Sequence, residues 1–394
     1  MNTAAAMRAY QGPALFSIGL RPFFLFSAIW AAVAVPLWVH AFTAGGPVGL
    51  TWHVHEMLFG YAGGVIVGFL MTAVPNWTGR MPVVGPPLMA MVGLWLAGRA
   101  AMLATAFSPD LAEAVWPAVV DSLFLLAMAG LIWREILAGR NWRNLPVAVM
   151  VTLLALSNVG FHVEAHLSGG LAPIATRAAL ALIAMLIALI GGRITPSFTR
   201  NWQLKRQGPL PATTGRFDAL TLAVTGLALA GWTAAPDQAV VGGAMAAAGA
   251  LNLIRLARWR GEATTAEPLV LILHLGYLWL AVGLGLVGAS VLWPDLIAAS
   301  AGIHALTAGA VGVMTLAVMT RAGRGHTGRP LEAGWTGSLI YILINMAALT
   351  RVVGGLWPAQ YQALLIVSAG LWCLAFLTFA VVYGPMLALP RPRA

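Results

Sequence analysis

Long apolar segments recur along the whole chain, and they limit what it can fold into. Twelve such segments, bounded by charges, prolines and glycines, cover residues 22–43, 53–78, 86–106, 114–134, 145–167, 171–192, 217–234, 238–257, 268–291, 299–320, 335–356 and 361–387. A helix of about 20 apolar residues crosses the hydrocarbon core of a bilayer, whereas the strands of a membrane barrel alternate apolar and polar residues. The sequence therefore predicts an all-α integral membrane protein with twelve transmembrane helices, forming a single polytopic domain over residues 1–394.

The charged residues support this interpretation and give an orientation. Only 9% of the residues are charged, against roughly 25% in a soluble domain, so lipid is the natural surrounding of most of the chain. The net charge of +10 would suit nucleic acid, but the basic residues lie in short loops between apolar segments, which excludes that partner. All 22 lysines and arginines except Arg99, Arg177 and Arg351 fall on one side of the predicted bilayer. Because basic loops face the cytoplasm, we expect both termini to be cytoplasmic.

Most of the histidines share one level of the predicted bilayer, near its outer face. Six of the eight belong to this group, namely His40, His53, His55, His162, His166 and His304. His274 lies in the inner part of its span, and His326 lies in a cytoplasmic loop. An ionisable side chain inside a span is costly, so the histidines within the spans are candidate functional residues, except His40, which we expect to be interfacial.

The spacing of the histidines decides which of them can share a metal ion. His162 and His166 are four residues apart, so one helix face can present both imidazoles to one ion; alternatively, both are interfacial residues that bond water. His53 and His55 are two residues apart, about 200° around a helix, so only one of them can face a given ion. His274 is either a polar site within the bundle or a partner in a helix–helix hydrogen bond.

An internal repeat links the second and tenth predicted spans. His55, Gly60, Gly63 and the Thr-Gly-Arg at 78–80 recur as His304, Gly309, Gly312 and the Thr-Gly-Arg at 327–329, all at one offset of 249 residues. The sixth span ends in a similar Gly-Arg at 192–193, which is a weaker match because glycine and arginine are common at helix ends. The repeat suggests three four-helix units in a pseudo-threefold arrangement.

The repeat places two histidines on spans of equivalent type. Imidazoles of His55 and His304 that face each other would be a pair of axial ligands for haem, although His304 alternatively makes an interhelical hydrogen bond. Haem propionates need cationic partners, and Arg99 and Arg177 are candidates unless they only extend towards the bilayer surface.

Several motifs resemble the NnrS family of membrane proteins. They are RPFFLFSA (21–28), WHVHEMLFGYAGGVIVGFLMTAVPNWTGR (52–80), FHVEA (161–165), GGRITPSFTRNW (191–202), HLGY (274–277) and HALTAGAVGVMTLAVMTRAGRGHTGR (304–329). The resemblance implies a bacterial inner-membrane protein that contains haem b and copper and protects against nitric oxide or nitrosyl species. The family's histidine motifs fall on His53, His55, His162, His274, His304 and His326.

The predicted plan is also similar in outline to the catalytic subunit of haem-copper oxidases. Span ten has one histidine rather than two, span six has no internal histidine, and span seven lacks a histidine pair, so we do not expect a complete binuclear centre. Copper would suit imidazole ligands, with His162 and His166 as the best local pair and His53 as a further candidate. Two other functions stay open: a membrane transporter, and a metal-handling or assembly factor without stable haem.

Overall fold

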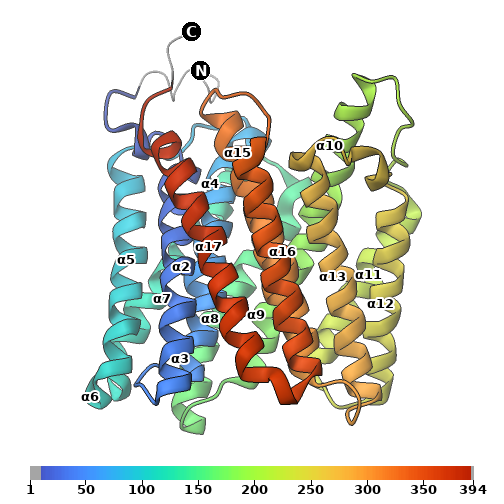
Figure 1. The fold of residues 1–394 in the computed structure, drawn as a ribbon. Helices are drawn as coiled ribbons and strands as arrows, with labels where there is room; N and C mark the ends of the chain where they lie inside the picture. The colour runs from blue at the N-terminus through green and yellow to red at the C-terminus, as the bar shows by residue number, and fades with distance from the viewer. Residues whose placement is uncertain (1–9, 392–394) are drawn as a thin grey trace. The chain divides into compact units, whose positions relative to one another are not determined.

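The described chain, residues 10–391 of a computed structural model, consists of helices and loops, with no strand in that range (Figure 1). The α-helices are α2 (Leu20–Ala44), α3 (Leu50–His55), α4 (Gly63–Thr78), α5 (Pro86–Phe107), α6 (Pro109–Glu113), α7 (Val115–Ala138), α8 (Leu145–Ser168), α9 (Pro173–Leu186), α10 (Gly192–Leu204), α11 (Arg216–Ala234), α12 (Ala239–Ala257), α13 (Pro268–Leu292), α14 (Ala299–His304), α15 (Gly312–His326), α16 (Gly334–Leu356) and α17 (Tyr361–Ala388). The extreme termini, predicted to be cytoplasmic, lie outside the described residues.

Three short π-helical turns and four 3₁₀ turns complete the helices. The π-helical turns are η2 (Glu56–Ala62), η4 (Ile187–Gly191) and η6 (Ala305–Val311), and the 3₁₀ turns are η1 (Ala14–Phe16), η3 (Trp142–Asn144), η5 (Gly261–Thr264) and η7 (Pro358–Gln360). Each π-helical turn joins two α-helices end to end, so that α3–η2–α4, α9–η4–α10 and α14–η6–α15 are continuous helical rods.

Twelve helical segments are long and apolar enough to cross a membrane, which confirms the predicted number. The clearest difference is the sixth span, predicted to end at residue 192, which continues as helix to Leu204. Gly79 and Gly328 end their helices with a left-handed backbone (φ 71° and 74°), whereas Gly192 has φ −66° and stays within the helix. The expected likeness between the Gly-Arg at 192–193 and the two Thr-Gly-Arg helix ends is therefore wrong.

The repeat between spans two and ten extends to the backbone. The π-helical turns η2 and η6 occupy residues related by the same offset that links His55 to His304. The sixth span also has a π-helical turn, and in all three spans the residue after that turn is a glycine, namely Gly63, Gly192 or Gly312. In the structure, Gly192 therefore corresponds to Gly63 and Gly312, and not to Gly79 and Gly328. Because π-helical turns are rare and often lie at functional sites, their recurrence makes these three spans candidates for carrying functional residues.

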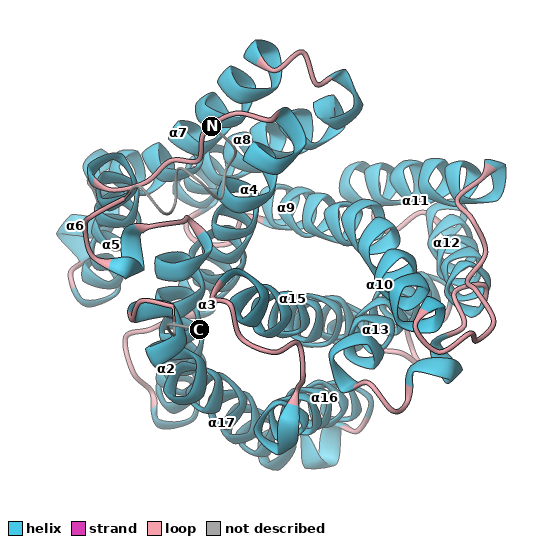
Figure 2. Ribbon diagram, turned by 90° about the horizontal axis from the view of Figure 1, so that it is seen from above, coloured by secondary structure: helices cyan, strands magenta, loops and turns pink. Residues whose placement is uncertain are grey.

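The chain divides into two compact units. The first comprises residues 1–179, 322–329 and 379–394, and the second comprises residues 180–321 and 330–378. Helices joined by loops make up the described residues of both units, and Figure 2 draws the helices in cyan and the loops in pink. The histidines expected to share a haem belong to different units, His55 to the first and His304 to the second.

Close helix packing in the first unit fixes the position of one buried carboxylate. Helix α5 packs along α7, and α7 packs along α8. Gly98 of α5 lies so close to Asp121 of α7 that an added Cβ would be 3.1 Å from the carboxylate and 3.2 Å from the Cα atom. The missing side chain lets the two helices approach and holds Asp121 against its neighbours.

Candidate metal centre

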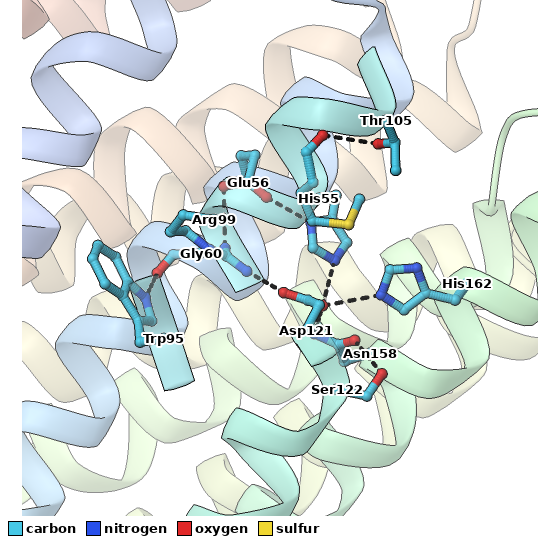
Figure 3. Close-up of polar contacts among 11 residues, drawn as sticks. His55, Glu56, Gly60, Trp95, Arg99, Thr105, Asp121, Ser122, Asn158 and His162 are labelled. Atoms are coloured by element: carbon cyan, nitrogen blue, oxygen red, sulfur yellow. Dashed lines mark hydrogen bonds and ion pairs between the residues drawn. The ribbon is translucent and has the colours of Figure 1, made fainter. Parts of the chain in front are cut away.

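Three potential metal ligands from three different helices meet in the first unit (Figure 3). His55 ends α3, Asp121 lies in the first half of α7, and His162 lies near the end of α8. The Nε2 atoms of His55 and His162 each lie 3.0 Å from the Oδ2 atom of Asp121. Side-chain exposure is 0% for His55, 1% for Asp121 and 14% for His162. The two imidazoles therefore share one carboxylate oxygen almost out of contact with solvent.

Polar side chains surround Asp121 and form hydrogen bonds with both of its carboxylate oxygens. Asn158, four residues before His162 on α8, donates to Oδ2 of Asp121 at 3.0 Å and accepts from the Ser122 hydroxyl at 3.2 Å. The Arg99 guanidinium of α5 donates to Oδ1 of Asp121. Both oxygens of this carboxylate thus have partners, which a buried charge requires.

Glu56 supplies a second buried carboxylate beside His55. Its Oε1 atom lies 2.9 Å from Nδ1 of His55, and its Oε2 atom accepts from Arg99 at 3.1 Å. Glu56 is the first residue of the π-helical turn η2, and Trp95 donates to the carbonyl of Gly60 in the same turn at 3.0 Å. The turn presents Glu56 and Gly60 to α5, so Arg99 can bridge Glu56 and Asp121.

The charges of this cluster create a place for a cation. Glu56 and Asp121 are two anions around the single cation Arg99, which leaves one excess negative charge when both imidazoles are neutral. A neutral imidazole has one N–H, so one of the two carboxylates at His55 would face a nitrogen lone pair. A proton or a metal ion on that nitrogen removes the repulsion and balances the charge.

Two imidazole nitrogens and a carboxylate oxygen form a common ligand set for transition metals. Within residues 10–391, the group of histidine, cysteine and acidic side chains close enough to hold one ion is His55, Asp121 and His162, whose ligand atoms lie within 4.8 Å of one another. Ligand bonds of about 2.0–2.2 Å allow neighbouring donor atoms roughly 3 Å apart, as observed here. Metal-bound histidines usually donate their other N–H to a carboxylate, and Glu56 occupies that position at His55.

A cavity of about 860 Å³ reaches the cluster from one side. His162 lines it together with His166, one helical turn further along α8, and with Trp52, Thr105 and Phe161. Phe59 and Phe161 lie with ring centroids 5.2 Å from the ring of His55. A small molecule in the cavity would therefore meet His162 first, while aromatic rings close the site around His55.

The other predicted site residues of the first unit lie apart from this cluster. His53 stacks on Trp38 with ring centroids 4.1 Å apart, whereas His55 contacts Asp121. The two histidines thus point to different partners, as their two-residue spacing predicted. His166 is exposed at the cavity, and Arg177 is half-buried in α9. His326 is half-buried, and its carbonyl accepts from Arg391 at 2.8 Å. Arg99, predicted as a propionate partner, bonds Glu56 and Asp121.

Two predicted histidines lie in the second unit. The Nδ1 atom of His304 lies 2.7 Å from the carbonyl of Ser300, one turn earlier, which directs Nε2 away from its own helix. The Nε2 atom of His274 lies 2.8 Å from the hydroxyl of Thr199, and the ring is buried. His274 therefore makes a helix–helix contact, which was one of its two predicted roles.

Sequence reasoning did not assign Asp121 and Asn158 to the site. Asp121 is a carboxylate in the middle of an apolar segment, and this rarity is the signal that would have indicated it. Asn158 precedes His162 by four residues, so both side chains lie on one helix face. No pattern within one helix shows which neighbouring helix that face meets.

One comparison with known proteins identifies the family of this chain. The family model described as NnrS protein matches residues 14–391, which is nearly the whole chain and includes every residue of the cluster. A search of curated proteins finds no match. The chain, a multi-pass membrane protein by its twelve candidate spans, belongs to the NnrS family.

Proposed function

We propose that this protein is a bacterial inner-membrane metalloprotein that binds one transition metal ion at His55, Asp121 and His162 and protects against nitric oxide or nitrosyl species. The convergence of two imidazoles on one buried carboxylate carries the proposal, because these three side chains form a ligand set that suits a transition metal and their excess negative charge favours a cation there. The general association of the family with nitric oxide stress supplies the substrate class.

The surroundings of the cluster suit a small neutral ligand. His162 and Phe161 both line the cavity, and the ring centroid of Phe161 lies 5.2 Å from that of His55. Nitric oxide is uncharged and apolar enough to dissolve in lipid, so it can reach a centre within the membrane spans without a charged pathway. A bound ion would supply an open coordination position and a one-electron couple for this ligand.

The residues around the ion have separate tasks in this proposal. Glu56 accepts the Nδ1–H of His55 and so holds the Nε2 lone pair towards the ion. Arg99 bonds both carboxylates and limits their negative charge. Asn158 fixes the orientation of Asp121. Copper and iron both accept two imidazoles and a carboxylate, so the ligand set suits either metal.

Haem b is proposed separately, with His304 as its axial ligand. The contact of Nδ1 with the Ser300 carbonyl fixes the ring, so His304 would offer its other nitrogen to a haem iron. The sequence repeat pairs His304 with His55, but both ring nitrogens of His55 contact carboxylates. That environment suits a small ion better than a haem iron, so we assign His55 to the ion.

A metal-handling role is the second candidate, favoured by the position of His166. This exposed imidazole lines the cavity one turn from His162, where it can take an ion from outside and pass it inwards. Such a protein would release its copper to a soluble chelator and would contain no stable haem.

Metal analysis with optical spectroscopy on the purified full-length protein tests the proposal. Cells are supplied with iron and copper, and His162→Ala is compared with wild type and with His40→Ala, an exposed histidine outside the cluster. We expect about one ion of iron or copper at the cluster in wild type and His40→Ala, and at least a tenfold loss of that ion in His162→Ala. A wild-type protein without metal or colour would contradict the proposal and favour the transporter.

A further inference from the structure

A second cavity lies in the first unit at the opposite ends of the same helices. Its volume is about 1180 Å³. Helices α5 and α7 and the loop between α4 and α5 line it, with Pro87, Ala90, Met91, Leu94, Ala127, Gly130 and Leu131 as the apolar walls. Pro87, Ala90 and Gly130 are exposed in the full structure, so the groove is open to the surroundings.

Two arginines and one glutamate lie at the end of this groove. Arg80 donates to Oε2 of Glu135 at 2.5 Å, and Arg134 donates to Oε1 of the same carboxylate at 2.8 Å. The Glu135 side chain is 9% exposed, whereas those of Arg80 and Arg134 are 42% and 59% exposed. The carboxylate thus holds two outward-facing guanidinium groups beside each other, and the group has one excess positive charge.

The groove combines these charges with walls that belong to membrane-spanning helices. Helix α4 ends at Thr78 and α7 ends at Ala138, so the arginines lie where the spans leave the apolar core. An occupant must therefore match a cationic end and an apolar length at once. A soluble anion would bind the guanidinium groups but leave the apolar walls uncovered. A neutral lipid would cover the walls but leave the two guanidinium groups without an anionic partner.

We propose that this groove is a binding site for one anionic phospholipid. Its phosphate accepts hydrogen bonds from Arg80 and Arg134, and one acyl chain lies along Ala90, Leu94 and Leu131 between α5 and α7. Charge-assisted hydrogen bonds from arginine to phosphate are among the strongest in proteins, and basic pockets between membrane helices are suited to anionic headgroups.

The lipid site is independent of the candidate metal centre. Asp121 and Arg134 are 13 residues apart on α7, which corresponds to about 20 Å of helix. The two sites share no lining residue. Substitutions in the groove should therefore change lipid binding and leave the metal content unchanged.

Two variants of different kinds separate lipid binding from folding. Arg134→Gln removes one guanidinium and leaves Arg80 to pair with Glu135. Gly130→Leu adds a side chain at an exposed helix position that lines the groove, where a Cβ would meet nothing within 4 Å, and the leucine should block the acyl chain. Arg143→Gln is the matched control, because this arginine is exposed and does not line the groove.

Native mass spectrometry of the full-length protein in detergent measures the binding directly. Phosphatidylglycerol and phosphatidylcholine with identical acyl chains are added in turn, with and without millimolar inorganic phosphate. We expect phosphatidylglycerol to bind with one tight site, and to bind on the order of tenfold more weakly in Arg134→Gln and Gly130→Leu, because each loses a charged hydrogen bond or acyl contact. Arg143→Gln should bind as wild type does, and phosphate should not compete.

Three results would overturn the proposal. Equal binding of the two lipids to wild type would show that the arginines do not distinguish an anionic headgroup from a zwitterionic one. Unchanged phosphatidylglycerol binding in both groove variants would place the lipid elsewhere. Full displacement by inorganic phosphate would show that the arginines hold a soluble anion instead.

Discussion

His55 and Asp121 are 66 residues apart in the chain, and Nε2 of the histidine lies 3.0 Å from Oδ2 of the aspartate. His162 lies at the same distance from the same oxygen. Asp121 is thus the residue that joins α3, α7 and α8 into one polar centre.

Asp121→Asn keeps the shape of the side chain and removes its charge. We expect loss of the bound metal, and a fall in stability of about 1.5–3 kcal/mol because Arg99 loses one charged hydrogen bond while Glu56 still balances its charge. Metal analysis and thermal unfolding of the purified variant measure the two effects. Retention of one ion at wild-type affinity would show that Asp121 is not a ligand.

Glu56→Gln tests the carboxylate on the far side of His55. The amide oxygen can still accept the Nδ1–H, but it is uncharged, so we expect the metal to be retained with about 10–100-fold weaker affinity. Competition with a chelator of known affinity measures this change. An affinity equal to that of wild type would mean that Glu56 does not orient the ligand.

Gly60→Ala tests the close approach of the π-helical turn to Arg99. An added Cβ would lie within van der Waals overlap of the Arg99 guanidinium and 2.8 Å from the Glu56 carboxylate, so both groups must move. We expect lower stability together with weaker metal binding. Gly93→Ala on α5 is the control, since a Cβ there meets nothing within 4 Å and should raise helix stability slightly.

Gly93→Ala and Gly60→Ala are compared by thermal unfolding and metal content. A Gly60→Ala protein as stable and as metal-rich as the control would contradict the packing described here.

Tyr277→Phe tests the polar network of the second unit. The Tyr277 hydroxyl accepts from Arg255 at 2.7 Å and donates to Asn252 at 2.6 Å, while Arg255 also bonds Asp218 at 2.8 Å. Its removal should cost about 1–3 kcal/mol because buried partners lose a hydrogen bond. The metal content should not change. A loss of the metal in this variant would tie the network to the metal centre.

Much of the fold could be predicted from the sequence because each span carries its own signal. Apolar length predicted the twelve spans, and the structure adds π-helical turns at the same offset that links His55 to His304. The exception at Gly192 has a physical reason: a glycine followed by arginine resembles a helix end, and only the backbone conformation shows that the helix continues.

The site could be predicted only in part. The predicted spans placed His55 and His162 at one level of the bilayer. The two-residue spacing predicted that His53 and His55 point in different directions, and the structure shows this. The shared role of Asp121 depends on which faces of α7 and α8 meet, and on Gly98 allowing α5 to approach. Such contacts between helices leave no periodic pattern in the chain, so the partner of His162 could not be foreseen. Metal binding by the pair His162 and His166 stays a prediction.

The ligand shell of the ion is the most direct test of the metal centre. X-ray absorption spectroscopy at the edge of the metal found in the wild-type protein, repeated with His55→Ala and His162→Ala, measures the number of imidazole ligands. We predict two imidazole nitrogens and one oxygen from the protein in wild type, and loss of the ion or of one imidazole in each variant. A wild-type shell without imidazole, or one unchanged in both variants, would contradict the account.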